Sequence, residues 1–423
     1  MPTLRHCVLG RFTEVATAEQ KEKMFDELRG LPSKIPEISS LVCGPDAGLS
    51  AGNHSFALNV EFNSDADYQV YATHPDHIKV INEFIKPILA PGSRTAVQFP
   101  LPTPLKYYIF GHPVLMSPSP DIHNAGFVRN GFAHCTYERY DTEDAAEVIA
   151  TIRGAGCGGG SVTIPHKESV MPHMDELTES AQRIGAVNTI TKLTDGRLRG
   201  DNTDWLGIKN QLLAKAPTAA GGALTGLICG AGGTARAAAF ALGKMGLSRV
   251  LVYNRTRSRA DGLVADFAAV FGATTSFEAI DDLSTLDALE RLEFVVDTTP
   301  SAAGFTLPTP LLTRLRPTCL EAAYIPRHTP FVVAALAAGC PVVEGVEMLF
   351  EQGCAQCEIW TGRSAPRAAI AAALLRELFG DARTHPASEK MEPRDKPPQG
   401  LTREVEATGG GGGTQANKRA RSE

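Results

Sequence analysis

The chain has 423 residues, which is too long for one ordinary hydrophobic core and predicts two or three domains. With 43% hydrophobic residues, 21% charged residues and a formal net charge of -6, the composition is that of a soluble globular protein and gives no electrostatic case for nucleic-acid binding. No run of about 18 apolar residues and no basic-then-apolar leader is visible, so we expect no membrane span and no secretory signal, and a cytoplasmic protein is the default.

The nine cysteines are an odd number scattered along the chain, which fits reduced thiols better than a disulfide framework. Cys354 and Cys357 have the spacing of a redox motif, but they fall in a predicted helix. We interpret them as ordinary helix residues and predict no metal site.

Residues 1–99 predict a compact α+β domain. A short strand over 4–12 is followed by Thr17, which can cap an amphipathic helix. The apolar residues of this helix recur at helical spacing: Ala18, Met24, Phe25, Leu28 and Leu31. Alternation over 55–62 marks a second strand, another helix follows Asp65, and residues 95–99 can close the sheet.

Three features of this domain resemble the stress-responsive dimeric α/β-barrel (Dabb) family, namely His6, a Gly44-Pro45 turn and the segment from Tyr71 to His77. The resemblance implies a ferredoxin-like α+β fold that buries its sheet face against a twin, and hence a homodimer. Some plant members are polyketide cyclases whose Tyr and His match Tyr71 and His77, and such a pair could serve acid–base chemistry. A packing or dimerising role for these two residues is the alternative.

Residues 100–104 (Pro-Leu-Pro-Thr-Pro) predict a stiff linker and a domain boundary. A buried strand over 107–110 then leads to Ser117 and Ser119, which precede a predicted helix over 125–130. Hydroxyls between a strand and a helix N-terminus can bind an anion, because the N–H groups there are unpaired. A plain loop with a helix cap is the alternative.

The glycine-rich run over 154–160 precedes a strand, and we interpret it as a flexible loop. The strand, over 162–165, delivers Lys167 to the head of a helix. Two more strand-like runs end in polar clusters that contain Asn188 and Asp204. Because residues past the carboxyl ends of strands line the ligand crevice of an open α/β sheet, we expect these side chains and Thr163 to face one pocket. The set suits a small, hydroxyl-rich substrate whose chemistry moves a proton.

Residues from about 210 to 344 predict a nucleotide-binding fold. An apolar strand over 224–229 leads into Gly230-Ala-Gly232-Gly233-Thr-Ala235, and an alanine-rich helix follows over 236–245. This is a dinucleotide fingerprint, in which Gly230 makes the tight turn, Gly232 admits the pyrophosphate and Ala235 allows close packing of helix and strand.

The next strand, over 249–253, ends where an NAD site usually keeps an acid for the ribose 2′-hydroxyl. Here no acid is present, and the segment supplies guanidinium, hydroxyl and amide groups: Asn254, Arg255, Thr256, Arg257, Ser258 and Arg259. Arginine offers several planar donors to phosphate oxygens, so the pattern predicts NADP over NAD. A solvated basic turn is the alternative.

Beyond about 384 the chain is rich in Pro, Glu, Lys and Gly and cannot bury a core, so we predict disorder over 384–423. The basic run over 417–421 could be a nuclear signal, and a solvated tail is the alternative.

Residues of about 105–381 resemble the shikimate dehydrogenases, with wording closest to the C-terminal domain of the fungal pentafunctional AROM polypeptide. The resemblance rests on ordered blocks, among them 162–167 (Val-Thr-Ile-Pro-His-Lys), 185–190 (Gly-Ala-Val-Asn-Thr-Ile), 200–204 (Gly-Asp-Asn-Thr-Asp), 324–330 and 345–353. It implies a two-lobed α/β fold, with a substrate-binding lobe over 105–208, a Rossmann lobe over 209–344, and helices over 345–382 that return to the first lobe.

The resemblance also implies roles for single residues in an NADP-dependent interconversion of 3-dehydroshikimate and shikimate. Ser117 and Ser119 would hold the carboxylate. The other substrate contacts would be Thr163, Asn188, Asp204, Tyr324 and Gln352. Two departures are visible, since Ser161 stands where the family commonly has Asn, and Glu321-Ala-Ala precedes Tyr324 where an Asp is frequent.

Reduction of a ketone builds negative charge on its oxygen, and a positioned proton donor must meet that charge. Lys167 is the predicted donor, and Asp204 would orient it. Two alternatives stay open, a quinate-type dehydrogenase of a secondary pathway with a barrel acting as cyclase, and a regulatory protein that binds such metabolites without turning them over.

Overall fold

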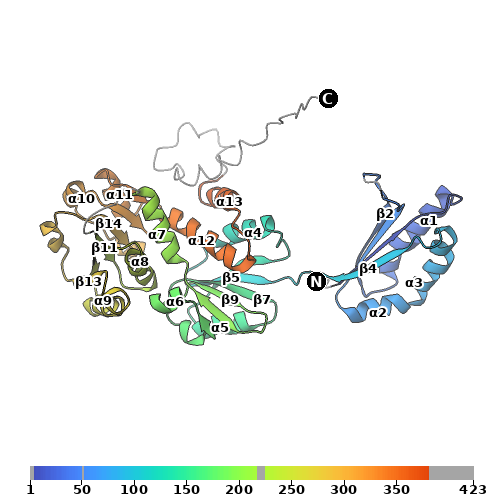
Figure 1. Cartoon of the computed structure of the whole chain (residues 1–423), viewed down its shortest axis with the longest axis horizontal. Helices are drawn as coiled ribbons and strands as arrows, with labels where there is room; N and C mark the ends of the chain where they lie inside the picture. The colour runs from blue at the N-terminus through green and yellow to red at the C-terminus, as the bar shows by residue number, and fades with distance from the viewer. Residues whose placement is uncertain (1–3, 50–51, 217–223, 381–423) are drawn as a thin grey trace, which may run out of the picture. The chain divides into compact units, whose positions relative to one another are not determined.

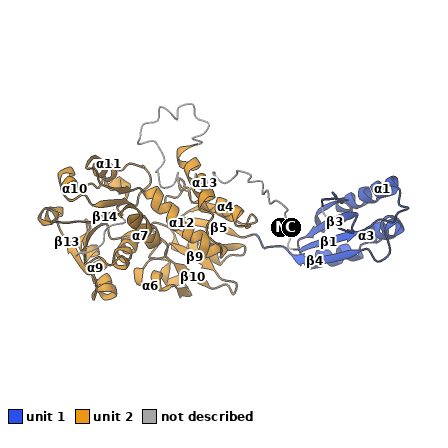
Figure 2. Cartoon of the chain, turned by 45° about the horizontal axis from the view of Figure 1, so that its top comes forward, with its two compact units in different colours: residues 1–104 blue, residues 105–423 orange. Residues whose placement is uncertain are grey.

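The computed structural model describes residues 4–49, 52–216 and 224–380. The chain divides into two compact units, residues 1–104 and 105–423 (Figure 2). The tail predicted to be disordered over 384–423 lies outside the described residues. Within those residues, no helix combines the length and apolar character that a membrane crossing requires.

The N-terminal unit is an antiparallel sheet with the strand order β2-β3-β1-β4, of which Figure 2 labels β3, β1 and β4. Its strands are β1 (Leu4–Gly10), β2 (Ile38–Pro45), β3 (Phe56–Phe62) and β4 (Thr95–Pro100). The helices α1 (Ala18–Arg29), α2 (Asp65–Thr73) and α3 (Pro75–Val80) pack with the sheet around one core. The predicted cap of α1 is confirmed, because Thr17 Oγ1 accepts a hydrogen bond from the Gln20 backbone N–H at 3.2 Å.

Strand β2 is missing from the sequence prediction, which placed a turn at Gly44-Pro45. Both residues lie in β2, where Pro45 is opposite Phe56 of β3. The strand gives a weak signal because its buried and exposed residues do not alternate regularly. Proline is tolerated there because β2 is an edge strand, whose outer N–H groups need no partner in the sheet.

The first lobe of the C-terminal unit is a mixed sheet with the order β6-β5-β7-β9-β10-β8. Its strands are β5 (Lys106–Gly111), β6 (Thr136–Asp141), β7 (Cys157–Val162), β8 (Glu176–Leu177), β9 (Thr189–Lys192) and β10 (Leu198–Asp201). Its helices are α4 (Ser119–Arg129), α5 (Ala145–Arg153) and α6 (Glu179–Ile184). Strand β7 is parallel to β5 and antiparallel to β9.

The prediction of a flexible glycine loop over 154–160 is wrong, because residues 157–160 belong to β7 and are buried. A Cβ atom at Gly159 would lie 2.2 Å from the Ile190 carbonyl oxygen, and one at Gly160 would lie 2.5 Å from the Tyr108 carbonyl oxygen. The glycines therefore permit close approach of neighbouring strands. From the sequence alone, the same run of glycines indicates a flexible loop.

The second lobe is a parallel sheet with the order β13-β12-β11-β14-β15-β16. Its strands are β11 (Thr225–Cys229), β12 (Arg249–Tyr253), β13 (Ser276–Ile280), β14 (Phe294–Asp297), β15 (Thr318–Glu321) and β16 (Val342–Val343). The helices α8 (Gly233–Lys244), α9 (Arg257–Phe271), α10 (Thr309–Leu315) and α11 (Pro330–Ala337) connect these strands.

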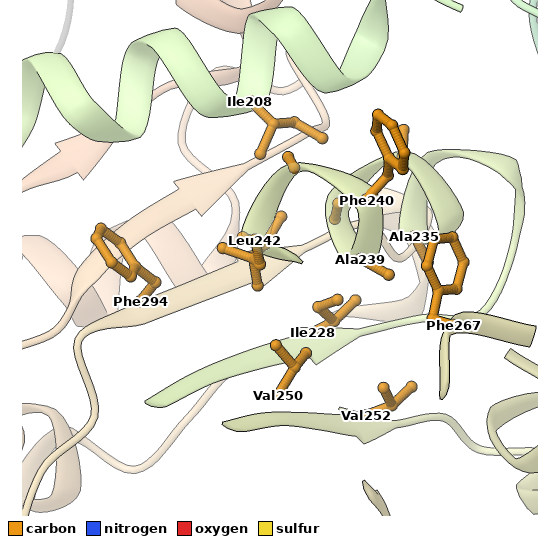
Figure 3. Close-up of a cluster of buried hydrophobic side chains, with 14 of the residues drawn as sticks. Ile208, Ile228, Ala235, Ala239, Phe240, Leu242, Val250, Val252, Phe267 and Phe294 are labelled. Carbon is orange, nitrogen blue, oxygen red and sulfur yellow. The ribbon is translucent and has the colours of Figure 1, made fainter. Parts of the chain in front are cut away.

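Helix α8 is the centre of the second lobe's core. Its alanines and Leu242 pack over Ile228 of β11 and Val250 of β12, and the rings of Phe240 and Phe267 complete the cluster (Figure 3). Small side chains let this helix lie close to the sheet, so its N-terminus is held firmly at the carboxyl end of β11.

Three further helices complete the C-terminal unit. They are α7 (Asp204–Lys215), α12 (Gly345–Thr361) and α13 (Arg367–Phe379). Helix α12 packs against α7 and α4, and α13 packs against α4 (Figure 1). Cys354 and Cys357 are buried free thiols within α12, which confirms their interpretation as helix residues.

Candidate active site

A pocket of the C-terminal unit lies where residues following the strands of both lobes meet. Its wall contains the predicted catalytic and substrate-binding side chains: Ser117, Ser119, Thr163, Lys167, Asn188, Asp204, Tyr324 and Gln352. No cluster of side chains able to hold a metal ion occurs among the residues placed in the structure.

Lys167 enters the pocket on a turn and not on a helix. Strand β7 ends at Val162, so the predictions of a strand over 162–165 and of a helix beginning at Lys167 are wrong. Pro165 has no N–H to continue the ladder, which favours a turn here. The turn is fixed at both ends, because the Thr163 N–H donates to the Phe110 carbonyl at 2.9 Å and the Val187 N–H donates to the Lys167 carbonyl at 2.7 Å.

The Lys167 ammonium is held by two oxygen atoms. Its Nζ lies 2.6 Å from Asp204 Oδ2 and 3.1 Å from Thr234 Oγ1. The side chains of Lys167 and Asp204 are only 12% and 6% exposed. The ion pair is therefore shielded from bulk water on most sides and reaches the pocket at one.

The sequence predicts that Asn188 ends a strand, but Asn188 directly precedes β9. Because β9 runs antiparallel to β7, the start of β9 lies beside the end of β7, with Thr189 opposite Ser161. The amide therefore arrives at the same edge as the turn that carries Lys167.

Asn188 forms hydrogen bonds with both Asp204 and Gln352 of α12. Its Nδ2 donates to Asp204 Oδ1 at 2.8 Å and to Gln352 Oε1 at 3.3 Å. Asp204 therefore accepts one hydrogen bond on each carboxylate oxygen, from Lys167 and from Asn188. These bonds fix the plane of the carboxylate.

The two serines lie at the beginning of α4. Ser117 Oγ donates to Ser119 Oγ at 3.0 Å, and both side chains are buried. Arg139 Nε donates to the Ser117 carbonyl at 2.8 Å. Tyr324, from the second lobe, is hydrogen-bonded to Ser117, and burial raises the pKa of its hydroxyl. Neutral hydroxyls next to a helix N-terminus and near a guanidinium suit a carboxylate.

The glycine turn after β11 has the shape that a dinucleotide needs. Gly230 has a φ of 110°, and a Cβ atom there would lie 2.4 Å from Thr298 Oγ1. A Cβ at Gly232 would meet nothing within 4 Å, and no side chain caps the helix that begins there. The open space beside Gly232 and the uncapped N-terminus of α8 therefore fit a pyrophosphate.

The predicted phosphate-binding arginines divide into two kinds. Arg257 is engaged by Asp261 at 2.8 Å and by Asp281 at 2.5 Å. Arg255 and Arg259 are exposed and form no side-chain hydrogen bond or ion pair with any residue of 4–49, 52–216 or 224–380. Asn254 Nδ2 donates to the Thr256 carbonyl at 2.8 Å and shapes the turn.

The pocket lining also contains residues to which the sequence prediction gave no site role, among them Ser161, Thr234 and Gln356. Ser161 Oγ donates to Gln356 Oε1 at 2.8 Å and accepts from the Tyr137 hydroxyl at 2.6 Å. Gln356 follows Gln352 by four residues on α12, so the i, i+4 spacing was a signal that both amides face the same side. For Thr234 the fingerprint gave no signal, because its partner Lys167 belongs to the other lobe.

Tyr71 and His77 lie together inside the N-terminal unit. Their rings stack with centroids 3.9 Å apart, and Tyr71 is only 1% exposed. The Tyr71 hydroxyl and His77 Nδ1 are buried without a hydrogen-bond partner among the described residues. Burial raises the pKa of Tyr71 and lowers that of His77, so both are held neutral.

Comparison with known proteins places both units. The stress responsive A/B barrel domain family (Dabb) matches residues 4–101. The shikimate dehydrogenase substrate binding domain matches 109–190, and the shikimate 5′-dehydrogenase C-terminal domain matches 345–375. The shikimate 5-dehydrogenase of Thermus thermophilus, solved with NADP(H) and shikimate, is 32% identical with a TM-score of 0.55, over 65% of this chain and 100% of that one. The chain belongs to the shikimate dehydrogenase family.

Two other similar proteins differ in their names and in how much of this chain they cover. The pentafunctional AROM polypeptide of Komagataella phaffii is 38% identical over 266 residues, which are 61% of this chain but only 17% of that polypeptide. The quinate dehydrogenase of Corynebacterium glutamicum, solved with NAD, is 26% identical with a TM-score of 0.58, over 64% of this chain and 98% of that one. Relatives with different substrates and cofactors therefore share this fold.

Proposed function

We propose that the chain is an NADP-dependent shikimate dehydrogenase, which interconverts 3-dehydroshikimate and shikimate. The observation that carries the proposal is the Lys167–Asp204 pair, held at 2.6 Å at the edge of a pocket lined by hydroxyl and amide groups. The Thermus thermophilus relative, solved with NADP(H) and shikimate, supports both the substrate and the cofactor.

Lys167 is the proton donor and acceptor of this mechanism. In the reductive direction its ammonium gives a proton to the oxygen that becomes the alcohol, and in the oxidative direction the neutral amine takes that proton back. Asp204 orients the amine and can accept a hydrogen bond from a neighbouring substrate hydroxyl. The charge that develops on the substrate oxygen is thus met inside a site that excludes most water.

The remaining polar groups orient the ring. Ser117, Ser119 and Tyr324 form the carboxylate-binding end, because their hydroxyls gather at the N-terminus of α4. Thr163, Asn188 and Gln352 surround the Lys167–Asp204 end and can bind ring hydroxyls. The substrate carboxylate would therefore lie at one end of the pocket, and the alcohol that reacts would lie at the other end.

The second lobe would hold the cofactor, which supplies or accepts the hydride when bound. Gly230, Gly232, Gly233 and Ala235 would admit the pyrophosphate at the N-terminus of α8. Asn254 and Thr256 shape the next turn. The guanidinium groups of Arg255 and Arg259, which pair with none of the described residues, would meet a ribose 2′-phosphate. The lack of an acid at the end of β12 supports NADP over NAD.

A quinate dehydrogenase that uses NAD is the second candidate, favoured by the fold shared with the Corynebacterium glutamicum enzyme. Initial rates of dinucleotide reduction on the full chain, with shikimate or quinate crossed with NADP or NAD, separate the two. Shikimate with NADP should be fastest by at least about tenfold. Quinate with NAD in first place would establish the second candidate, and silence in all four mixtures with metabolite binding by calorimetry would indicate a sensor.

We further propose that the N-terminal unit makes the protein a homodimer. The sheet face opposite its helices exposes apolar side chains, with Val42 at 66%, Val97 at 52% and Phe99 at 39%, next to an ion pair between Arg5 and Glu61. The register places Val97 beside Cys7 of β1, and Asn59 of β3 separates Cys7 from Val42, so these residues share one face. Burial of such a face against a second copy would remove it from water.

The dimer can be tested in the full chain. Val97→Asp together with Val42→Asp should give a monomer in analytical ultracentrifugation while dinucleotide reduction continues. Val70→Asp, at an exposed position of α2, is the matched control and should leave the dimer intact. A double variant that remains dimeric would show that another surface joins the subunits.

A further inference from the structure

The Lys167 side chain rests on the dinucleotide-binding turn of the opposite lobe. A Cβ atom at Gly233 would lie 3.0 Å from Lys167 Cβ and 3.2 Å from its Cδ, so the stem of the lysine runs directly across this glycine. The next residue, Thr234, receives a hydrogen bond from Lys167 Nζ at 3.1 Å. One residue pair therefore connects the proton-transfer group of one lobe with the cofactor turn of the other.

An ammonium group has three protons and no acceptor site. In Lys167 one proton is directed to Asp204 Oδ2 at 2.6 Å and a second to Thr234 Oγ1 at 3.1 Å. Two fixed directions on a tetrahedral nitrogen determine the third. Without Thr234, the amine at the end of a four-carbon stem could rotate about its bond to Asp204.

We propose that Thr234 is a positioning residue, whose hydroxyl fixes the Lys167 ammonium against Asp204 and so aims the remaining proton into the pocket. The proposal rests on the proposed dehydrogenase function. It assigns to the fingerprint turn a second task besides binding the cofactor, because the same residues that face the pyrophosphate also orient the acid–base group.

The contact between the lobes does not depend on Thr234 alone. Arg236, two residues further along α8, donates from Nε to the Ile184 carbonyl at 2.6 Å and pairs with Asp266 at 2.8 Å. Gly185 lies against the same guanidinium. Loss of the Thr234 hydroxyl should thus leave α8 docked and should change only the orientation of the amine.

The test compares Thr234→Val, which removes the hydroxyl but keeps the shape, with Thr234→Ser, which keeps the hydroxyl. We expect kcat to fall about tenfold in Thr234→Val, while the KM for shikimate and the Kd for NADP stay within about twofold. Thr234→Ser should restore most of kcat. Thr313→Val is the control, since the Thr313 hydroxyl donates to the Thr309 carbonyl at 2.8 Å within α10, and Thr313 is not among the residues that line the pocket.

A second measurement needs no turnover. Trinitrobenzenesulfonate modifies lysine amines, and the rate at Lys167 can be followed by peptide mass spectrometry on the cofactor-free protein. The rate should rise in Thr234→Val, because the amine is released, and should be unchanged in Thr234→Ser and Thr313→Val. An unaltered rate in Thr234→Val, or a loss of kcat that serine does not restore, would overturn the proposal. A wild-type chain inactive in all four mixtures would instead refute the dehydrogenase, and the labelling rates would still decide the role of Thr234.

Discussion

Two pairs of titratable side chains, Lys167 with Asp204 and Tyr71 with His77, lie in surroundings of opposite kind. The first pair is bound by charge, supported by Asn188, and open to a pocket on one side. The second pair is stacked, with Tyr71 buried and His77 half-buried, and its Tyr71 hydroxyl and His77 Nδ1 find no partner in the described part of the chain. The first arrangement therefore places a proton-carrying group at a pocket, whereas the second holds two neutral side chains against each other.

The largest expected effect is the loss of kcat when Lys167, of the pair that reaches the pocket, is replaced. Lys167→Ala should lower kcat by about 10²- to 10⁴-fold, because it removes the group that moves the proton. NADP binding, followed by fluorescence titration, should be preserved, since the predicted phosphate-binding groups, the uncapped N-terminus of α8 and the guanidinium groups of Arg255 and Arg259, stay in place. A variant with normal kcat would remove Lys167 from the mechanism and erase the contrast with Tyr71.

The segment that follows β12 also contains both kinds of group. Arg257 is paired with two carboxylates, whereas Arg255 and Arg259 pair with none of the described residues. Arg255→Ala and Arg259→Ala should together raise the KM for NADP by about 10- to 100-fold, with little effect on the KM for NAD, because they delete charge-assisted bonds to the phosphate. Arg257→Ala is the matched control, since Asp261 and Asp281 already occupy this guanidinium. If Arg257→Ala raised the KM for NADP more than the double variant, the assignment would be reversed.

A third pair, Asp297 and Glu321, shows how burial changes the pKa of carboxyl groups. They are register partners on β14 and β15, both are buried, and no cation pairs with either among the described residues. Burial raises the pKa of Asp297 from 3.8 to about 6. Burial, with Asp297 as the next contribution, raises the pKa of Glu321 from 4.5 to about 7.

The sign of the pH dependence follows from these values. The folded protein keeps both protons to a higher pH than the unfolded chain, so the pair adds stability below about pH 4 and loses this contribution as the pH rises to about 7. Asp297→Asn should raise the free energy of unfolding at pH 8 by on the order of 2 kcal/mol and have little effect at pH 4. Urea unfolding at the two pH values measures this, and a larger gain at pH 4 than at pH 8 would contradict it.

The smallest effect compares two buried tyrosines. The Tyr137 hydroxyl donates to Ser161 at 2.6 Å, and the Tyr71 hydroxyl has no partner among the described residues. Tyr137→Phe should therefore cost about 1–2 kcal/mol of stability, whereas Tyr71→Phe should be neutral or slightly stabilising. Urea unfolding of both variants measures the difference. A Tyr71→Phe loss as large as that of Tyr137→Phe would show that the Tyr71 hydroxyl is engaged.

The sequence alone predicts those parts of the protein that depend on interactions between residues close together in the chain. The Thr17 cap, the cofactor turn from Gly230 to Ala235 and the helical position of Cys354 depend on neighbours within a few residues, and the strand–turn–helix setting of the fingerprint is local as well. The predicted substrate-site residues do line one pocket, and several of them directly precede, begin or follow a regular element, as Asn188, Asp204 and Thr163 do.

Only the tertiary structure decided how these residues meet. The antiparallel pairing of β9 with β7 carries Asn188 to the end of β7, and the packing of α8 between the lobes sets Thr234 against Lys167. The glycines of β7 illustrate the same limit, since their meaning comes from Tyr108 and Ile190 on adjacent strands. Contacts between residues distant in the chain leave no periodic pattern in a sequence window, and the fold alone brings them within hydrogen-bonding distance.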